Sequence, residues 1–173
     1  MTRGTLAVPI AAQGESGDAV ALLRSGYLEM LNLIERLHRH LLDVIGAELS
    51  RGGHKDINSV QALLLFNIGA AELTAGELRS KGHYLGSNVS YNLKKLVDGG
   101  YIDHERSMRD RRSVLVKLTE KGMAVSRVVA VLYERHLDTL LRTNELRGDQ
   151  LATVNASLRS LERFWSDQIR FGL

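Results

Sequence analysis

The chain has 173 residues, 44% of them hydrophobic, and it contains no cysteine. This length can bury a core without a disulfide or a structural metal, and the missing cysteine excludes disulfides, thiolate catalysis, cysteine zinc sites and cysteine redox sensing. Lys and Arg number 23 against 20 Asp and Glu, so the formal net charge of +3 is weak evidence for a nucleic-acid partner.

The first 17 residues are mildly apolar, but the run is short and Pro9 interrupts it. A secretory signal needs a longer apolar stretch, so we expect residues 1–17 to form a mobile arm. No later run approaches the roughly 20 apolar residues of a membrane span. The sequence therefore predicts a soluble, cytoplasmic protein without a membrane partner.

A helical pattern covers residues 18–49, where an apolar stripe includes Leu23, Tyr27, Ile34 and Leu41. The stripe is too broad for one contact. It indicates either a central core helix or a helix shared with a second subunit, and we favour the second interpretation. Residues 51–54 break the pattern, and Asn58 offers a cap for a core helix that continues to Ile68.

The Thr74-x-x-Glu77 pattern is typical of a capping box and predicts a short helix from Thr74 to near Gly82. A second helix follows over residues 87–98, because Val89, Leu93, Leu96 and Val97 share one face. Gly99 and Gly100 should end it. Its other face is polar and basic, and carries Ser87, Asn88, Ser90, Tyr91, Lys94 and Lys95.

Two β-prone runs, Tyr101–Ile102 and Val114–Leu118, predict a hairpin with a charged tip. Residues 79–117 contain nine basic and four acidic residues, a net charge of +5, so positive charge is concentrated here. Helix, turn, second helix and hairpin is the order of a winged helix-turn-helix. The polar loop contributes Arg106, Arg109, Asp110, Arg111 and Arg112.

Two further helices are predicted after the hairpin. Thr119 is a good N-cap for an apolar helix that runs through Leu141, and residues 144–148 break it. The last helix has the apolar spacing of a coiled-coil seam, which favours packing between subunits and hence a homodimer. The predicted dimer-interface residues are Leu151, Val154, Leu158, Leu161 and Trp165.

No enzymatic motif is present: the sequence lacks GxSxG, a P-loop and a GxGxxG segment before a helix. The six histidines do not have the spacing of a metal site. We therefore predict a protein without catalytic residues, metal or cofactor.

The stretch from Asn58 to Gly122 resembles the MarR family of bacterial transcription regulators. Three motifs carry this resemblance, namely LT..EL, VS...KKLV..GYI and above all DRRSVLVKLTEKG from Asp110 to Gly122. Tyr91 stands where the family often has arginine, and Asn92 where it usually has an apolar residue. The resemblance implies a mainly α fold with a β-hairpin wing, in which a winged helix-turn-helix lobe (56–122) is flanked by dimerisation helices (18–50 and 123–173) in one unit spanning 18–173.

The resemblance also implies a homodimer that binds double-stranded DNA at a pseudo-palindromic operator, acts as a repressor and responds to a small-molecule effector. The effector would bind among the helices over 18–49, 58–68 and after Thr119, although its identity and ligand residues stay open. In the family pattern the wing arginine, here Arg112, enters the minor groove and is braced by Asp110.

Ser87, Asn88, Ser90 and Tyr91 are placed to read major-groove bases, although Ser87 or Asn88 could simply cap the helix. Lys94 and Lys95 are assigned to DNA phosphates, and the alternative is that they belong to an ordinary solvated helix face. For the wing arginine, the alternative to a DNA contact is a solvated hairpin tip with an exposed ion pair. Two other functions use the same surface: a winged-helix module that binds protein, and a nonspecific architectural DNA binder.

Overall fold

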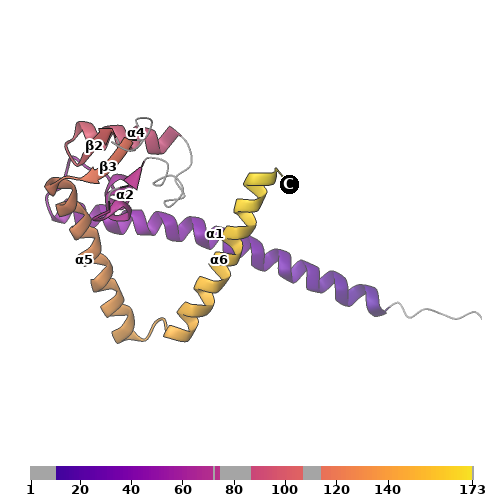
Figure 1. Ribbon diagram of the computed structural model, residues 1–173. Helices are drawn as coiled ribbons and strands as arrows, with labels where there is room; N and C mark the ends of the chain where they lie inside the picture. Colours follow the sequence, from indigo (N-terminus) through magenta and orange to yellow (C-terminus); the bar gives the residue numbers. More distant parts are fainter. Residues whose placement is uncertain (1–10, 72, 75–86, 107–113, 173) are drawn as a thin grey trace, which may run out of the picture.

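The computed structural model describes residues 11–71, 73–74, 87–106 and 114–172 (Figure 1). A lobe made of α2, α4 and the strands lies at one end of the long helix α1, while α5 leads away from the lobe and α6 turns back. This is the predicted mainly α fold with a winged hairpin. In chain order the elements are α1 (Ala11–Arg51), α2 (Ser59–Ile68), β1 (Leu73–Thr74), α4 (Ser87–Asp98), β2 (Ile102–Arg106), β3 (Val114–Leu118), α5 (Glu120–Thr143) and α6 (Gly148–Phe171).

Helix α1 is longer than the sequence pattern predicts. It begins at Ala11 rather than at residue 18, so residues 11–17 of the expected arm are helical. The prediction relied on where the apolar stripe begins, and residues 11–17 lie before that stripe. Residues 1–10 lie outside the described part of the chain.

Local capping signals set the ends of several helices as predicted. The backbone N–H of Gln61 donates to Asn58 Oδ1 at 2.9 Å, and the backbone N–H of Asn58 donates to Gln61 Oε1 at 3.1 Å, which completes a capping box. Thr119 caps α5 by accepting a hydrogen bond from Gly122 N–H at 3.1 Å. Asn144 ends α5 in the left-handed conformation (φ 52°), which Asn tolerates better than most residues.

The wing sheet has three strands in the order β1-β3-β2. Strands β2 and β3 form the predicted antiparallel hairpin, with Ile102 opposite Leu118 and Arg106 opposite Val114. Strand β2 is longer than predicted, so Arg106 belongs to a strand and not to the loop. Its ladder to β3 supplies hydrogen bonds that offset the weak β-propensity of its charged residues.

Strand β1 was not predicted. Leu73 pairs with Val116, and Thr74 pairs with Leu115. Thr74 is therefore a strand residue, and the helix predicted to begin after it, with Glu77 and Leu78, falls on residues outside the described part. A long-range partner decides the conformation of Thr74, and local spacing cannot reveal that partner.

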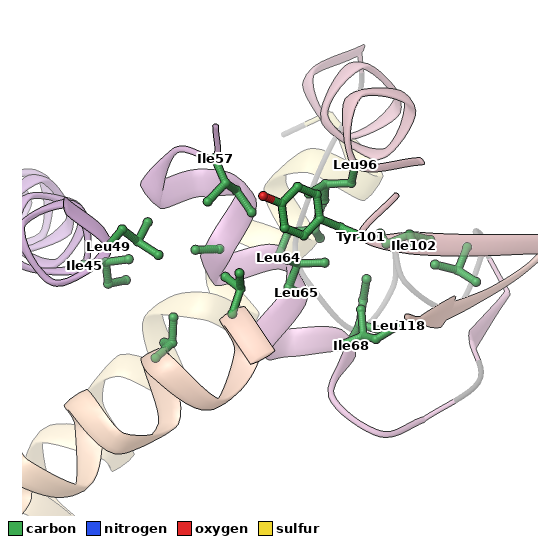
Figure 2. Packing of buried hydrophobic residues seen from close by; sticks show 14 of the residues in the cluster. Ile45, Leu49, Ile57, Leu64, Leu65, Ile68, Leu96, Tyr101, Ile102 and Leu118 are labelled. Carbon is green, nitrogen blue, oxygen red and sulfur yellow. The ribbon is translucent and has the colours of Figure 1, made fainter. Parts of the chain in front are cut away.

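The core lies where α1, α2, α4, α5 and the sheet meet (Figure 2). Leu49, Leu65 and Leu132 contribute from α1, α2 and α5, and Leu96 contributes from α4. All are nearly inaccessible to solvent, so each burial stabilises the fold by about 1.5–3 kcal/mol. Burial of Leu64 and Ile68 agrees with the predicted core helix, although Val60 in the first turn of this helix is 38% exposed.

Apolar side chains stay exposed on the helices outside this core. Leu22 and Leu23 of α1 are 75% and 74% exposed, and α6 contributes no buried residue among those described. A surface of this kind is typical of an interface. Within the described residues, no helix combines the length and apolarity needed to cross a membrane.

An ion pair joins α1 to α5. Arg135 Nη2 lies 2.7 Å from Glu48 Oε2, and Arg51 also pairs with this carboxylate. The Glu48 side chain is only 16% exposed. The hydrogen bond from Arg135 is the largest cause that lowers the pKa of Glu48 below its usual 4.5, and the two positive charges add to it.

We expect Glu48→Gln to remove an acid-dependent part of the stability. Because the folded chain holds the Glu48 pKa below 4.5, the pair stabilises fully above that pH and loses its contribution as the pH falls through the lowered pKa. The difference in unfolding free energy between wild type and variant should therefore be constant near pH 7 and shrink below pH 4.5. Denaturant titrations from pH 7 to pH 3 would measure it, with Glu35→Gln in an exposed pair as control. A pH-independent difference would contradict this assignment.

Gly122→Ala should strongly destabilise the fold. A Cβ at Gly122 would lie 2.1 Å from the carbonyl oxygen of Tyr101, where backbone cannot easily move away. We expect a loss of about 2–3 kcal/mol of unfolding free energy, measured by urea denaturation. Gly148→Ala is the matched control, because a Cβ there meets nothing within 4 Å. Equal stabilities of the two variants would show that the contact between Gly122 of α5 and the Tyr101 backbone tolerates a side chain.

Candidate nucleic-acid interface

Helix α4 has one packed and one solvent-facing side, as its sequence spacing predicts. Leu96 is 1% exposed, and Leu93 and Val97 are partly buried against the core. The exposed side carries Ser90, Tyr91, Lys94 and Lys95. Ser87 and Asn88 form the first turn of the helix, so all six predicted residues belong to one element.

Tyr91 and Lys95 lie one turn apart on the exposed side of α4 and contact each other. The Lys95 ammonium is 5.8 Å from the centroid of the Tyr91 ring, within range of a weak cation–π interaction. The Tyr91 side chain is 61% exposed. The helix therefore presents an aromatic ring and two positive charges to solvent.

The predicted wing residues are only partly located. Arg106 ends β2 opposite Val114, at the distal end of the hairpin. Arg109, Asp110, Arg111 and Arg112 lie outside the described residues. Strand β2 packs against α4 and pairs with β3, and the proposed tip contacts stay a prediction.

Backbone hydrogen bonds end α4 sharply. Tyr101 N–H donates to Leu96 O at 2.8 Å, and Gly100 N–H donates to Val97 O at 2.9 Å, the pattern of a Schellman motif. Gly100 has a φ of 70°, which glycine adopts without a Cβ penalty. The predicted glycine stop is confirmed, and Gly100 supplies the left-handed residue.

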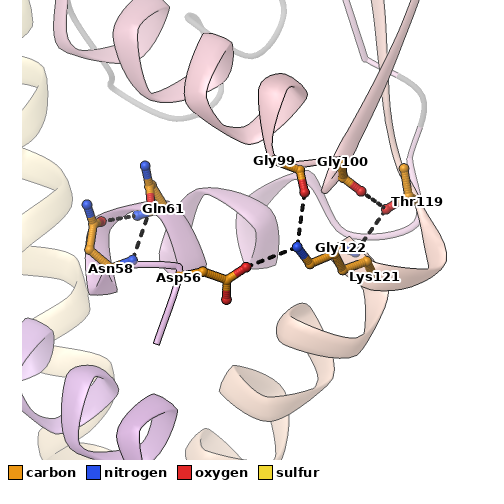
Figure 3. Close-up of polar contacts among 8 residues, drawn as sticks. All are labelled: Asp56, Asn58, Gln61, Gly99, Gly100, Thr119, Lys121 and Gly122. Atoms are coloured by element: carbon orange, nitrogen blue, oxygen red, sulfur yellow. Dashed lines mark hydrogen bonds and ion pairs between the residues drawn. The ribbon is translucent and has the colours of Figure 1, made fainter. Parts of the chain in front are cut away.

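The first turn of α5 holds this end of α4 (Figure 3). The Thr119 hydroxyl donates to Gly100 O at 2.8 Å, while the Thr119 N–H donates to Tyr101 O at 3.1 Å. The Lys121 ammonium donates to Gly99 O and to Asp56 Oδ2, both at 3.0 Å. Its nitrogen also lies 3.9 Å from the centroid of the Tyr101 ring.

These contacts shift three pKa values. The Tyr101 hydroxyl first, and then the Lys121 ammonium, lower the pKa of Asp56. The hydrogen bond that Lys121 donates to Asp56 is the main reason that the pKa of Lys121 is raised. Burial, followed by the Asp56 carboxylate, raises the pKa of Tyr101, whose buried hydroxyl meets no described group in full hydrogen-bond geometry. The ionised forms of Asp56 and Lys121 are thus favoured.

Asp56 and Lys121 are site residues that sequence reasoning missed. Lys121 belongs to the LTEKG segment, but the pattern gave it no role beyond following the Thr119 cap. Its partner Asp56 is 65 positions away along the chain. No local spacing could have linked them, although a lysine one residue before the close-packed Gly122 was a usable signal.

The predicted dimer-interface residues line α6 and remain accessible in the single chain. Leu151, Val154 and Leu158 are 40%, 46% and 45% exposed, and Leu161 and Trp165 are half-buried. Among the described residues, no cluster of His, Asp and Glu has the arrangement of a metal site.

Comparisons with known proteins agree with this architecture. The MarR family model matches residues 55–113. The chain is 42% identical over 154 residues to the exopolysaccharide II synthesis transcriptional activator ExpG of Rhizobium meliloti (strain 1021), and the match covers 85% of this chain and 75% of that protein.

Solved structures give the same result. MarR from E. coli in its reduced form is 28% identical with a TM-score of 0.57, covering 75% of this chain and 93% of its own. A MarR mutant from E. coli complexed with operator DNA is 25% identical with a TM-score of 0.62, and the match covers 79% of this chain and 95% of the mutant chain. FabT of Streptococcus pneumoniae, solved in complex with DNA, has a TM-score of 0.65 at 22% identity, and the match covers 82% of this chain and 98% of the FabT chain. At this identity the likeness supports the fold alone. The chain belongs to the MarR family of winged helix-turn-helix transcription regulators.

Proposed function

We propose that this regulator binds double-stranded DNA in the cytoplasm, as a homodimer on a pseudo-palindromic operator. The observation that carries the proposal is the exposed face of α4, where Ser90, Tyr91, Lys94 and Lys95 are accessible while the opposite face packs on the core. A helix of this kind fits the major groove. The operator complex of the MarR relative from E. coli supports the same use of the lobe.

The predicted contact residues of α4 divide into two roles. Ser87, Asn88, Ser90 and Tyr91 read base edges, because they occupy the helix start, where helix-turn-helix proteins contact bases. Lys94 and Lys95 neutralise phosphates. Such contacts fix the position of the protein on the duplex without reading its sequence.

The wing completes each half-site. The wing arginines Arg106, Arg109 and Arg111 would contact the same DNA. Arg112, braced by Asp110, would enter the minor groove. A narrow, A·T-rich groove attracts a guanidinium group, so this contact would favour A·T-rich flanks.

The exposed apolar faces support the homodimer. Helices α1 and α6, with the far end of α5, present Leu23, Leu141 and Leu158 to solvent, and the isolated chain gives them no cover. A second copy would bury these faces. The dimerisation region we propose comprises residues 18–50 and 123–173 around the DNA-binding lobe 56–122.

The direction of regulation depends on where the operator lies. The sequence resemblance predicted a repressor, whereas the 42% identical relative is named a transcriptional activator. A dimer that covers a promoter represses, and the same dimer placed upstream can activate. That relative's name supports activation for this chain as the second possibility.

A small-molecule effector would act between the helices and the lobe. A cleft of about 340 Å³ lies between α1 and the start of α2, lined by residues that include Leu42, Asp43, Asn58 and Val60. An effector there would shift the dimer only by preferring one of its two conformations. The cleft supports this response without identifying the ligand.

Selection of duplexes from a random pool would test DNA binding, and two variants would separate the roles on α4. Lys94→Ala should weaken binding to every sequence and reduce the salt slope by about one unit per contact. Tyr91→Ala or Asn88→Ala should cost about 1–3 kcal/mol of discrimination at one base pair in each half-site. Titration of the selected and a scrambled duplex at several salt concentrations would measure both effects.

Failure of this test takes three forms. If the wild type enriches no sequence but binds all duplexes, the protein is an architectural binder. If it retains no DNA at low salt, the lobe serves a protein partner. Equal losses on both duplexes for all variants would mean that α4 is only a charged surface.

Leu158→Asp should produce monomers. The substitution places a charge on the apolar seam of α6, where its burial against a second copy would be costly. Light scattering at micromolar concentration should report a dimer for the wild type and a monomer for the variant. Ser160→Asp adds the same charge on the far side of α6 and should remain dimeric. A monomeric wild type would contradict the dimer, together with its expected half-site spacing of about 10 bp.

A further inference from the structure

The ammonium of Lys121 joins three parts of the lobe. It contacts Asp56 before α2 and the carbonyl oxygen of Gly99 at the C-terminal end of α4 (Figure 3). It also lies over the ring of Tyr101 before β2. An ammonium has three hydrogens, and two of them are directed to oxygen atoms at 3.0 Å while the charge lies over the ring. Two of its three donor hydrogens are therefore engaged inside the protein.

Stability alone does not explain this arrangement. The Lys121 and Asp56 side chains are 49% and 63% exposed, and ion pairs with this exposure contribute little to folding. The bond to Gly99 is different in kind, because the carbonyl at a helix C-terminus carries the negative end of the helix dipole. Lys121 thus attaches a charge to the end of α4 rather than to its packed face.

Helix α4 needs such an attachment to hold its orientation. Its packed side is apolar, with Leu96 fully buried but Leu93 and Val97 only partly covered. Apolar contacts resist separation but are non-directional, so they restrict a small rotation or sliding of the helix less than a hydrogen bond does. Hydrogen bonds to base edges have strict geometry, and their strength therefore depends on that orientation.

We propose that Lys121, held in place by Asp56, is a positioning residue that fixes the orientation of α4 and thereby sharpens its discrimination between base sequences. This inference rests on the proposed DNA-binding function. It assigns specificity to a residue that contacts no DNA. Lys121 differs in this from Lys94, whose ammonium is available to phosphates.

Lys121→Met tests the proposal, because it removes the charge and keeps most of the side-chain volume. We expect about 3- to 10-fold weaker binding to a duplex selected by the wild type and less than about twofold change on a scrambled duplex. The salt slope should not change, since no phosphate contact is lost. Lys121→Arg should retain discrimination, because a guanidinium group can donate to both oxygens. All variants are compared at a temperature where circular dichroism shows them folded.

Two further variants separate positioning from charge. Lys55→Met removes the same charge beside Asp56 and should leave discrimination unchanged. In the double variant Asp56→Lys with Lys121→Asp, an ion pair can form again, but a carboxylate then faces Gly99 O and the Tyr101 ring. We expect no recovery of discrimination. Full recovery, or an equal loss on both duplexes for Lys121→Met, would overturn the proposal.

Hydrogen exchange tests the same residue without DNA. Lys121→Met should speed exchange of the Gly100 and Tyr101 amides by about fivefold or more and leave α6 unaffected. Unchanged exchange at these amides would overturn the positioning role whatever the DNA result. A further outcome is that the wild type selects no duplex while Lys121→Met still speeds exchange of the Gly100 and Tyr101 amides. In that case the proposed DNA function fails and the role of Lys121 in base discrimination is overturned, but the attachment of α4 by Lys121 stands.

Discussion

The close approach of α5 to the backbone of Tyr101 is the constraint on which the lobe depends. Gly122 allows it, because any Cβ there would collide with Tyr101 O. The approach places the Thr119 hydroxyl and the Lys121 ammonium against the carbonyls of Gly100 and Gly99. One residue without a side chain thus brings the start of α5 to the end of α4 and to the first strand of the hairpin.

Apolar burial and polar contacts have different roles where the start of α5 meets the end of α4. Leu96, Tyr101 and Ile102 are almost fully buried, and their burial drives the lobe to close. The polar groups near them are exposed or half-exposed, so they add little free energy. They are directional, however, and we propose that they determine how the closed elements are oriented. Stability and precision are therefore carried by different residues of the same segment.

How much could be predicted from the sequence depends on whether a signal was local. Asn58 with Gln61, Thr119 with Gly122, and Gly100 each act within a few residues, and they were placed correctly. Apolar spacing likewise identified the packed face of α4.

Long-range partners account for what could not be predicted. Strand β1 was not predicted, because Leu73 and Thr74 pair with Val116 and Leu115 far along the chain. Strand β2 extends to Arg106 because β3 pairs with it, and Lys121 meets Asp56 only in the folded chain. The start of α1 was missed for another reason, since residues 11–17 lie before the apolar stripe on which the prediction relied.

Helix α5 belongs to both halves of the molecule, and its burial changes along its length. Val125, Val129 and Leu132 are buried in the lobe core, whereas Leu137, Leu140 and Leu141 are exposed beyond it. Arg135 lies between these parts and ties the helix to Glu48 of α1. In the homodimer we propose, a second copy would cover the far end, and any shift of that end would move the first turn that carries Thr119 and Lys121. The residues that we propose to orient α4 thus stand at the point where a change in the proposed dimer would reach the exposed face of α4.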